Sequence, residues 1–179
     1  MSIEKDVVSR AIKGDGGAFA QLYEEHFDKI YRYIYLKVGN QAEAEDLTQE
    51  VFVKALEAIS SYKWRNLPFV SWLFRIAHNQ AIDYLRKQSK VEKVAWDNNV
   101  TRVDEPTPEV IAERSLKVEE LADNIKKLPP AQQEVISLRF GSELSIAEVA
   151  KALGKNPGTV KALQYNGIAA LRKMMLGEG

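Results

Sequence analysis

The sequence contains no cysteine among its 179 residues. This absence excludes disulfide bonds, thiolate metal sites and a cysteine nucleophile. The chain also lacks any apolar run long enough to cross a bilayer, and no apolar signal region follows Met1. We therefore expect a cytoplasmic protein, a location with which the lack of cysteine is compatible.

Histidine is nearly as scarce, because His26 and His78 are the only two in the chain. A helical di-iron enzyme would need Glu-x-x-His pairs, but the residues three positions before these histidines are Tyr23 and Arg75. This argues against a helical metalloenzyme, and we expect no metal, no cofactor and no enzymatic activity. We interpret His26 as a hydrogen-bonded core or boundary residue and His78 as a helix-face residue.

The chain has no net charge, with 25 basic and 25 acidic residues. A zero net charge argues against a nucleic-acid-binding protein, but the charges are segregated along the sequence. The net charge is −4 over residues 1–60, +5 over 61–90, −5 over 91–124 and +4 over 125–179. Because exposed charges interact over only about 10 Å at ordinary salt concentrations, each basic block can contact phosphates while the acidic blocks face elsewhere.

Apolar residues recur at helical spacing along most of the chain, and no alternating run supports a sheet. The pattern predicts an all-α protein of two small helical domains, residues 1–90 and 109–179, joined by a flexible acidic linker at 91–108 that is rich in Asp, Asn and Pro. The predicted helices are Ile3–Ile12, Ala18–Val38, Ala42–Ile59, one from Pro68 (after an N-cap at Asn66) to about Lys90, Glu109–Lys127, Ala131–Phe140, Ile146–Leu153 and Pro157–Met175.

The last two predicted helices have the signals of a helix-turn-helix. Ser145 and Glu148 fit a capping box, Gly154 suits a tight turn with positive φ, and Asn156-Pro157 supplies the next N-cap and first-turn proline. The second helix of this motif enters the major groove, where lysines neutralise phosphates and Gln or Thr contact base edges. The candidate contacts on the exposed side of this second helix are Lys155, Thr159, Lys161, Gln164 and Tyr165. A plain helical hairpin without a role in DNA binding is the alternative.

Gly167 lies in the middle of the same helix. Glycine there loosens a helix by roughly 1 kcal/mol relative to alanine, unless close packing requires it.

Two features of the N-terminal half also suit DNA binding. The fourth helix carries a basic and amide-bearing stripe opposite its apolar face, and the loop at residues 60–67 mixes aromatic rings with cations. Unpaired bases stack on such rings at about 1–3 kcal/mol each. A solvated helix face and a loop anchored by core aromatics are the alternatives. The stripe consists of Arg75, Asn79, Asp83, Arg86 and Lys90, and the loop includes Tyr62, Lys63, Trp64 and Arg65.

The third helix has an apolar stripe that includes Phe52 and Leu56. Asp46, Gln49 and Glu50 fall on one side of this stripe, where a helical partner could meet both apolar and acidic groups. The alternative is an ordinary solvated helix face.

Together these segments resemble the extracytoplasmic-function (ECF) group of sigma factors in the sigma-70 family. Residues 44–52 (AEDLTQEVF) resemble the helix that binds core RNA polymerase, and residues 69–86 resemble the −10 recognition helix. Residues 128–135 and the helix-turn-helix resemble the −35-binding domain. These matches keep the family's order and cover nearly the whole chain outside residues 1–17 and the linker.

The resemblance implies an alternative sigma factor that binds bacterial core RNA polymerase and directs promoter recognition and transcription initiation. It implies promoter DNA and an anti-sigma factor as further partners, without insertion into a membrane. The loop would capture a flipped base of the non-template strand. The implied contacts are Asp46, Gln49, Glu50 and Phe52 for polymerase, Lys63, Trp64, Arg65, Asn79, Asp83, Arg86 and Lys87 for the −10 element, and Lys155, Thr159, Lys161, Gln164 and Tyr165 for the −35 element.

Two other classes remain as alternatives. A DNA-binding regulator that does not engage polymerase would explain residues 128–175 but would leave the first ninety residues without a role. An inactive sigma-like decoy would carry the same motifs, and transcription with core enzyme would distinguish it.

Overall fold

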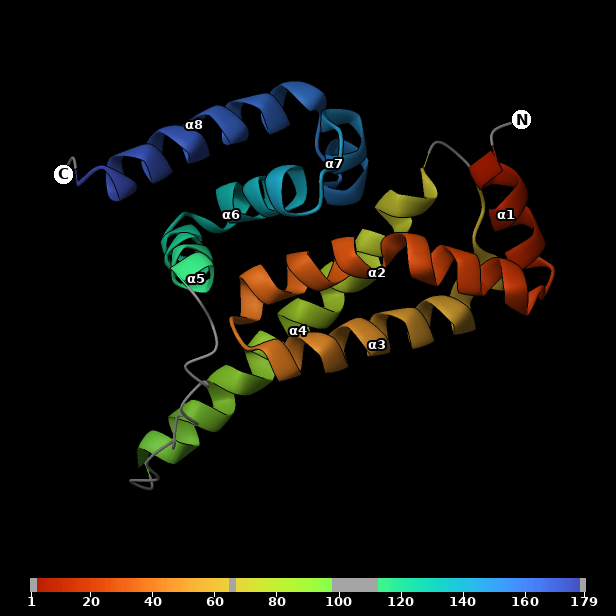
Figure 1. Cartoon of the computed structure of the whole chain (residues 1–179), viewed down its shortest axis with the longest axis horizontal. Coiled ribbons are helices and arrows are strands. Elements are labelled where there is room, and N and C mark those ends of the chain that lie inside the picture. Colours follow the sequence, from red (N-terminus) through yellow and green to blue (C-terminus); the bar gives the residue numbers. More distant parts are fainter. Residues whose placement is uncertain (1–2, 65–66, 98–112, 178–179) are drawn as a thin grey trace.

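The computed structural model describes residues 3–64, 67–97 and 113–177. All regular structure in these ranges is helical, as predicted (Figure 1). None of the described helices is long and apolar enough to cross a membrane. The elements are α1 (Ile3–Ile12), α2 (Gly16–Val38), α3 (Gln41–Ala58), the 3₁₀ turn η1 (Ile59–Ser61), α4 (Phe69–Asp97), α5 (Glu113–Lys126), α6 (Pro130–Ile136), the π-helical turn η2 (Ser137–Gly141), α7 (Ile146–Leu153) and α8 (Pro157–Met175).

The helix-turn-helix begins and ends at the predicted local signals. The Ser145 hydroxyl accepts from the Glu148 N–H at 3.1 Å, and the Glu148 carboxylate accepts from the Ser145 N–H at 2.9 Å, which completes the capping box. Gly154 has φ of 65°, in the left-handed region, and the Asn156 side chain accepts from the Thr159 N–H at 2.8 Å. These short-range bonds confirm the predicted bounds of α7 and α8.

Two predicted helix ends are wrong. The fourth helix continues to Asp97 instead of ending near Lys90, because residues 91–97 contain no glycine or proline to interrupt it. The predicted α-helix at 131–140 ends at Ile136 and continues as the π-helical turn η2. The predicted N-cap Asn66 lies outside the described residues, as does the linker beyond Asp97.

Helices α1 to α4 form one group around large buried side chains. Ile30, Tyr33, Leu73 and Phe74 are all at most 1% exposed, and the Tyr33 and Phe74 rings meet edge to face with centroids 5.6 Å apart. Helices α5 to α8 form a second group, in which α8 lies so close to α6 that a Cβ at Gly167 would come within 2.8 Å of the Ile136 Cγ1 atom. Close packing therefore accounts for the glycine in the middle of α8.

The two groups pack directly against each other, an arrangement that the sequence did not predict. One continuous cluster of buried apolar residues runs from α1 through Val135 and Leu138 to Val149 and Val160. Figure 1 shows α7 beside the beginning of α4, while the C-terminal part of α4 extends away from both groups. We call the contact region between the two groups the seam. The predicted domain bounds at 90 and 109 stay predictions.

His26 is buried in the N-terminal group at 7% exposure, with its ring 5.6 Å from that of Phe69. Neither of its ring nitrogens has a hydrogen-bond partner among the described residues, so the expectation of a hydrogen-bonded histidine is wrong. Burial, with a smaller contribution from the Lys29 charge, lowers the pKa of His26 from 6.5 to about 4. The folded protein therefore holds this imidazole neutral at pH 7.

We predict that His26 makes stability dependent on pH. His26 takes up a proton near pH 6.5 in the unfolded chain but only near pH 4 in the folded protein. The free energy of unfolding is therefore unaffected by His26 above pH 6.5 and falls as the pH is lowered toward 4. Between about pH 7.5 and about pH 5 the free energy of unfolding falls by roughly 2 kcal/mol through His26. Urea denaturation at the two pH values should show a smaller decrease in the free energy of unfolding for His26→Leu than for the unchanged protein. Equal decreases would contradict a buried, neutral His26.

We also predict that Gly154→Ala destabilises the protein. No atom lies within 4 Å of the position that a Cβ would occupy there, so the cost of about 1–2 kcal/mol comes from the left-handed backbone alone. Gly16→Ala is the matched control, because its surroundings are equally open but its φ is not positive. Thermal unfolding should show a loss of stability for Gly154→Ala and no loss for Gly16→Ala.

Candidate nucleic-acid interface

The beginning of α8 exposes most of the side chains predicted to contact DNA. Lys155, Thr159 and Lys161 are exposed before and within its first turns, and Tyr165 is 76% exposed. Gln164 differs, because it is half-buried and its side-chain oxygen accepts from Arg139 Nε at 2.8 Å. Its amide N–H groups and one lone pair of its oxygen are left for a base edge.

Arg139 is a residue that sequence reasoning missed. Its second donor, Nη1, bonds the Leu144 carbonyl at 2.6 Å, so the guanidinium joins η2, the loop before α7, and α8. The only signal in the sequence was its membership of the C-terminal basic block. Arg139 therefore holds α8 against η2.

In the loop before α4, Tyr62 is buried whereas the ring of Trp64 is partly accessible. Tyr62 is 5% exposed and its hydroxyl donates to the Leu67 carbonyl at 2.6 Å, which makes it the core anchor considered as an alternative. Trp64 is half-buried, with its ring nearly perpendicular to that of Tyr62 and the Lys5 ammonium 5.5 Å from its ring centroid. Lys63 is exposed, and Arg65 lies outside the described residues.

Helix α4 presents the other predicted −10 residues together. Asn79, Asp83, Arg86 and Lys87 are exposed, and their spacing places them on one face of the helix. Arg86 Nη1 forms an ion pair with Asp83 Oδ1 at 3.9 Å, and such a surface pair contributes at most about 1 kcal/mol. These side chains can therefore turn toward a nucleic acid at little cost.

Helix α3 exposes the predicted polar residues but not the predicted aromatic one. Asp46 and Glu50 are exposed, and exposed Gln49 bonds the Tyr23 hydroxyl through Nε2 at 2.9 Å. Phe52 is 4% exposed and packs against the Tyr23 ring at 4.7 Å, so it supports the helix from inside.

Two apolar side chains of α3 face outward beside the acidic residues. Val53 and Leu56 are each 54% exposed. Leu56 was predicted to lie in the buried stripe and is not, because the interior is filled by Val51, Phe52 and Ala55. The exposed face of α3 therefore combines apolar and acidic groups, which suits an apolar and basic partner surface.

At the seam, the first turns of α4 bond directly to α7. The Ser71 hydroxyl donates to the Glu148 carbonyl at 2.9 Å. Arg75 donates from Nη2 to the Lys151 carbonyl at 2.7 Å and from Nε to the Ala152 carbonyl at 3.3 Å. A cation at the C-terminal end of α7 is favourable, because the last carbonyls of a helix lack partners within the helix and carry partial negative charge.

A second polar contact at the seam surrounds Glu134 of α6, which is 8% exposed. Its carboxylate accepts from the Tyr33 hydroxyl at 2.6 Å, forms an ion pair with the Lys37 ammonium and lies 3.3 Å from His78 Nδ1. All three partners belong to α2 and α4, on the other side of the seam. Nearby, the Ser142 hydroxyl donates to the Lys29 carbonyl at 2.7 Å.

The protonation of these groups follows from their burial. Burial raises the pKa of Tyr33 well above its usual value, so the hydroxyl remains a donor to Glu134. Burial, and then the nearby charge of Lys37, lowers the pKa of His78, which keeps the imidazole neutral at pH 7. A neutral His78 with its proton on Nδ1 can donate to the Tyr33 oxygen 3.0 Å away, a tautomer that we infer from this geometry.

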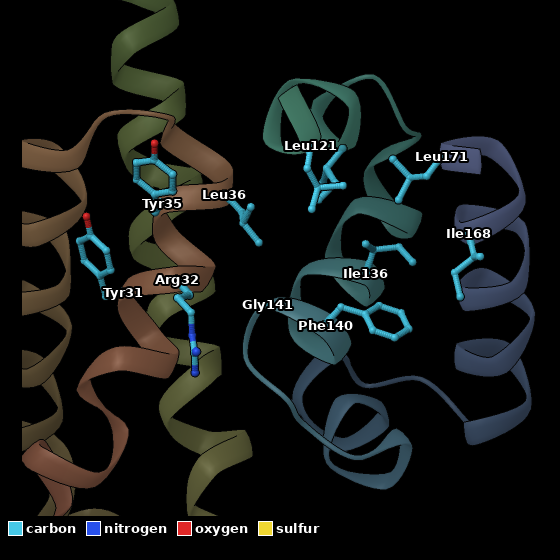
Figure 2. Close-up of a pocket in the computed structure, with 11 residues that line it drawn as sticks. Tyr31, Arg32, Tyr35, Leu36, Leu121, Ile136, Phe140, Gly141, Ile168 and Leu171 are labelled. Carbon is cyan, nitrogen blue, oxygen red and sulfur yellow. The ribbon is translucent and has the colours of Figure 1, made fainter. Parts of the chain in front are cut away.

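The described residues also form clefts along the seam. A cleft of about 400 Å³ lies between the loop before α4 and α7, and its lining includes Trp64, Pro68, Glu148 and Lys151. An apolar groove of about 520 Å³ separates α2 from α5, α6 and α8 (Figure 2). Figure 2 shows Tyr35 and Leu36 on one wall and Leu121, Ile136, Phe140 and Ile168 on the other.

No group of three or more His, Cys, Asp or Glu side chains that could hold a metal ion occurs among the residues described.

Both helical groups are similar to parts of known proteins. Residues 22–91 match the family described as Sigma-70 region 2, and residues 125–173 match the family described as Sigma-70, region 4. The chain is 37% identical over 171 residues to the ECF RNA polymerase sigma factor BldN of Streptomyces coelicolor, in an alignment that covers 95% of this chain and 65% of BldN. It is 36% identical over 180 residues to the ECF RNA polymerase sigma factor SigW of Bacillus subtilis, with 96% of each chain covered.

The fold has a counterpart among solved structures. CnrH, solved in complex with the cytosolic domain of CnrY, superimposes with a TM-score of 0.78 at 22% identity over 99% of this chain and 100% of CnrH. This similarity shows the helical fold of the described residues.

Proposed function

The chain belongs to the ECF group of sigma-70 factors, proteins that direct bacterial RNA polymerase to promoters at transcription initiation, and we propose how its surfaces divide that work. The exposed face of α3 binds core polymerase. The loop before α4 and the stripe on α4 contact the −10 element, and the start of α8 contacts the −35 element. The proposal assigns the chain no catalytic reaction of its own.

One observation carries this assignment. The exposed residues predicted for the three roles lie in three separate places: on α3, on α4 with the loop before it, and at the start of α8. Each place has the chemistry that its role requires. Asp46 and Glu50 sit beside exposed Val53 on α3, whereas the exposed face of α4 includes Arg86 and Lys87. The start of α8 combines lysines with Thr159 and so offers both phosphate contacts and a base contact.

Within the proposal, the interior residues have supporting roles. Phe52 holds α3 in place from the core, and Arg139 fixes Gln164 beside the exposed face of α8. Trp64 provides the ring on which a flipped non-template base stacks.

We also infer an anti-sigma factor as a partner. CnrH, which shares the fold, was solved with the cytosolic domain of CnrY. The groove in Figure 2 offers a continuous apolar wall that suits the apolar face of an amphipathic helix. A polypeptide held there would touch both helical groups at once.

Run-off transcription tests the proposed function. Bacterial core polymerase supplemented with this protein should produce discrete transcripts from a library of promoter fragments, and core polymerase alone should not. Absence of specific transcripts despite stable association with core polymerase would favour the decoy alternative.

We predict that Asp46→Ala combined with Gln49→Ala weakens association with core polymerase by about tenfold or more, because a combined loss of about 1.4 kcal/mol at the interface is a tenfold change in affinity. Both side chains are exposed, so the fold should persist. Lys161→Ala on α8 is the matched control and should leave this association unchanged. Fluorescence anisotropy with labelled protein measures it, and equal affinities for both variants would contradict the role of α3.

We predict the opposite pattern for promoter binding. Lys161→Ala in the assembled holoenzyme should weaken binding to all promoter fragments to a similar degree and reduce the slope of log affinity against log salt by about 1, because a phosphate contact carries no sequence information. Filter binding at several salt concentrations measures this slope. Tight, sequence-specific binding of a promoter duplex by the free protein would contradict the proposal that promoter recognition depends on core polymerase.

A further inference from the structure

Arg139 is joined both to α8 and to the loop that precedes α7. Its Nε atom donates to the Gln164 side-chain oxygen at 2.8 Å, and its Nη1 atom donates to the Leu144 carbonyl at 2.6 Å. The Leu144 N–H in turn bonds the Leu138 carbonyl at 3.0 Å, and Leu144 is only 1% exposed. Because the guanidinium is planar and is held at two points, its position beside α8 is fixed.

The bond to Arg139 decides which end of the Gln164 amide is free. A guanidinium has only donors, so the amide atom that it bonds is the oxygen. The other end, Nε2, has no acceptor among the described residues and is not a buried atom. Gln164 follows the exposed Lys161 by three residues on the same face of α8. The side chain therefore offers amide N–H groups beside a predicted phosphate contact.

The charge of Arg139 makes Gln164 a stronger donor. Arg139 has no ion-pair partner among the described residues, and its Cζ atom lies 5.7 Å from the centroid of the Phe140 ring. A positive charge at the oxygen end polarises the amide, which strengthens its N–H groups as donors. The same charge repels the amine hydrogens of a base that approaches the remaining lone pair of the oxygen.

The edges of adenine and guanine differ in what they ask of a glutamine. A free glutamine contacts adenine with both ends, because its oxygen accepts from N6 while its nitrogen donates to N7. Guanine instead presents two acceptors, O6 and N7. A glutamine whose oxygen is already bonded to a cation therefore suits guanine better than adenine.

Resting on the proposed function, in which the start of α8 contacts the −35 element, we propose that Arg139 is a positioning residue that determines specificity. It holds Gln164 as a hydrogen-bond donor, so that one base of the −35 element is read as guanine rather than adenine. Arg139 acts through Gln164 and needs no contact with that base. The preference belongs to the pair, so loss of either side chain abolishes it.

Selection from a promoter library tests this proposal. Core polymerase assembled with the full-length protein binds fragments with a randomised −35 element, and the bound fragments are sequenced. The unchanged protein should enrich guanine over adenine by about tenfold at one position. Arg139→Met keeps the length of the side chain but removes its donors and its charge. It should lower this ratio to about one or less, because the freed Gln164 then contacts adenine with both ends.

Two further variants separate positioning from stability. Arg172→Met, at an exposed position near the end of the same helix, is the matched control and should retain the preference. Gln164→Ala should lose it, and adding Arg139→Met to Gln164→Ala should not change the selected base again. If Arg139 acted on stability alone, its variant would bind all fragments less and still select the same base.

Gln164→Glu gives an independent test if circular dichroism shows that Arg139→Met does not fold. The new carboxylate can still bond Arg139 but has no donor, so the selected base should change from guanine to cytosine, whose N4 amine donates to carboxylates. An unchanged base in Gln164→Glu, in Gln164→Ala or in folded Arg139→Met would overturn this inference alone. Failure of the unchanged holoenzyme to enrich any −35 sequence would overturn the proposed role of α8, and this inference with it.

Discussion

The contact of Glu134 with Tyr33 and Lys37 is the interaction on which the arrangement of the two helical groups depends. A buried carboxylate is strongly unfavourable without partners, and this one finds all of them on the opposite group. Because Tyr33 and Lys37 lie on α2 and Glu134 lies on α6, the contact favours one rotation of α6 against α2. Ridge and groove packing alone would permit several such rotations.

That constraint explains why the candidate surfaces differ in accessibility. The exposed faces of α3 and of the first turns of α8 lie away from the seam and are open to partners. The first turns of α4 lie on the seam, where Ser71 and Arg75 bond α7, and the loop before α4 lines one side of a cleft that α7 bounds on the other. On the first turns of α4 the Arg75 guanidinium is thus occupied by backbone carbonyls of α7.

Local signals account for most of what could be predicted about the fold. The capping box at Ser145 and Glu148, the left-handed turn at Gly154 and the Asn156-Pro157 start act within a few residues, so they determine the bounds of α7 and α8 in any tertiary context. The end of α4 at Asp97 could not be predicted, because the apolar periodicity stops near Lys90 while the helix continues. Periodicity reports which face is buried, whereas helix propensity persists without it.

The sequence by itself determined that the chain is helical, that it ends in a helix-turn-helix and that its charge lies in separate blocks, because each of these properties depends on neighbouring residues. Only the tertiary structure decided which of the predicted contacts are accessible. Phe52 and Tyr62 proved to be interior residues, Gln164 is bonded to Arg139, and Arg75 bonds α7. The pairing of Glu134 with Tyr33 spans 101 positions of the chain, and such a contact depends on how whole helices pack, which no local pattern encodes.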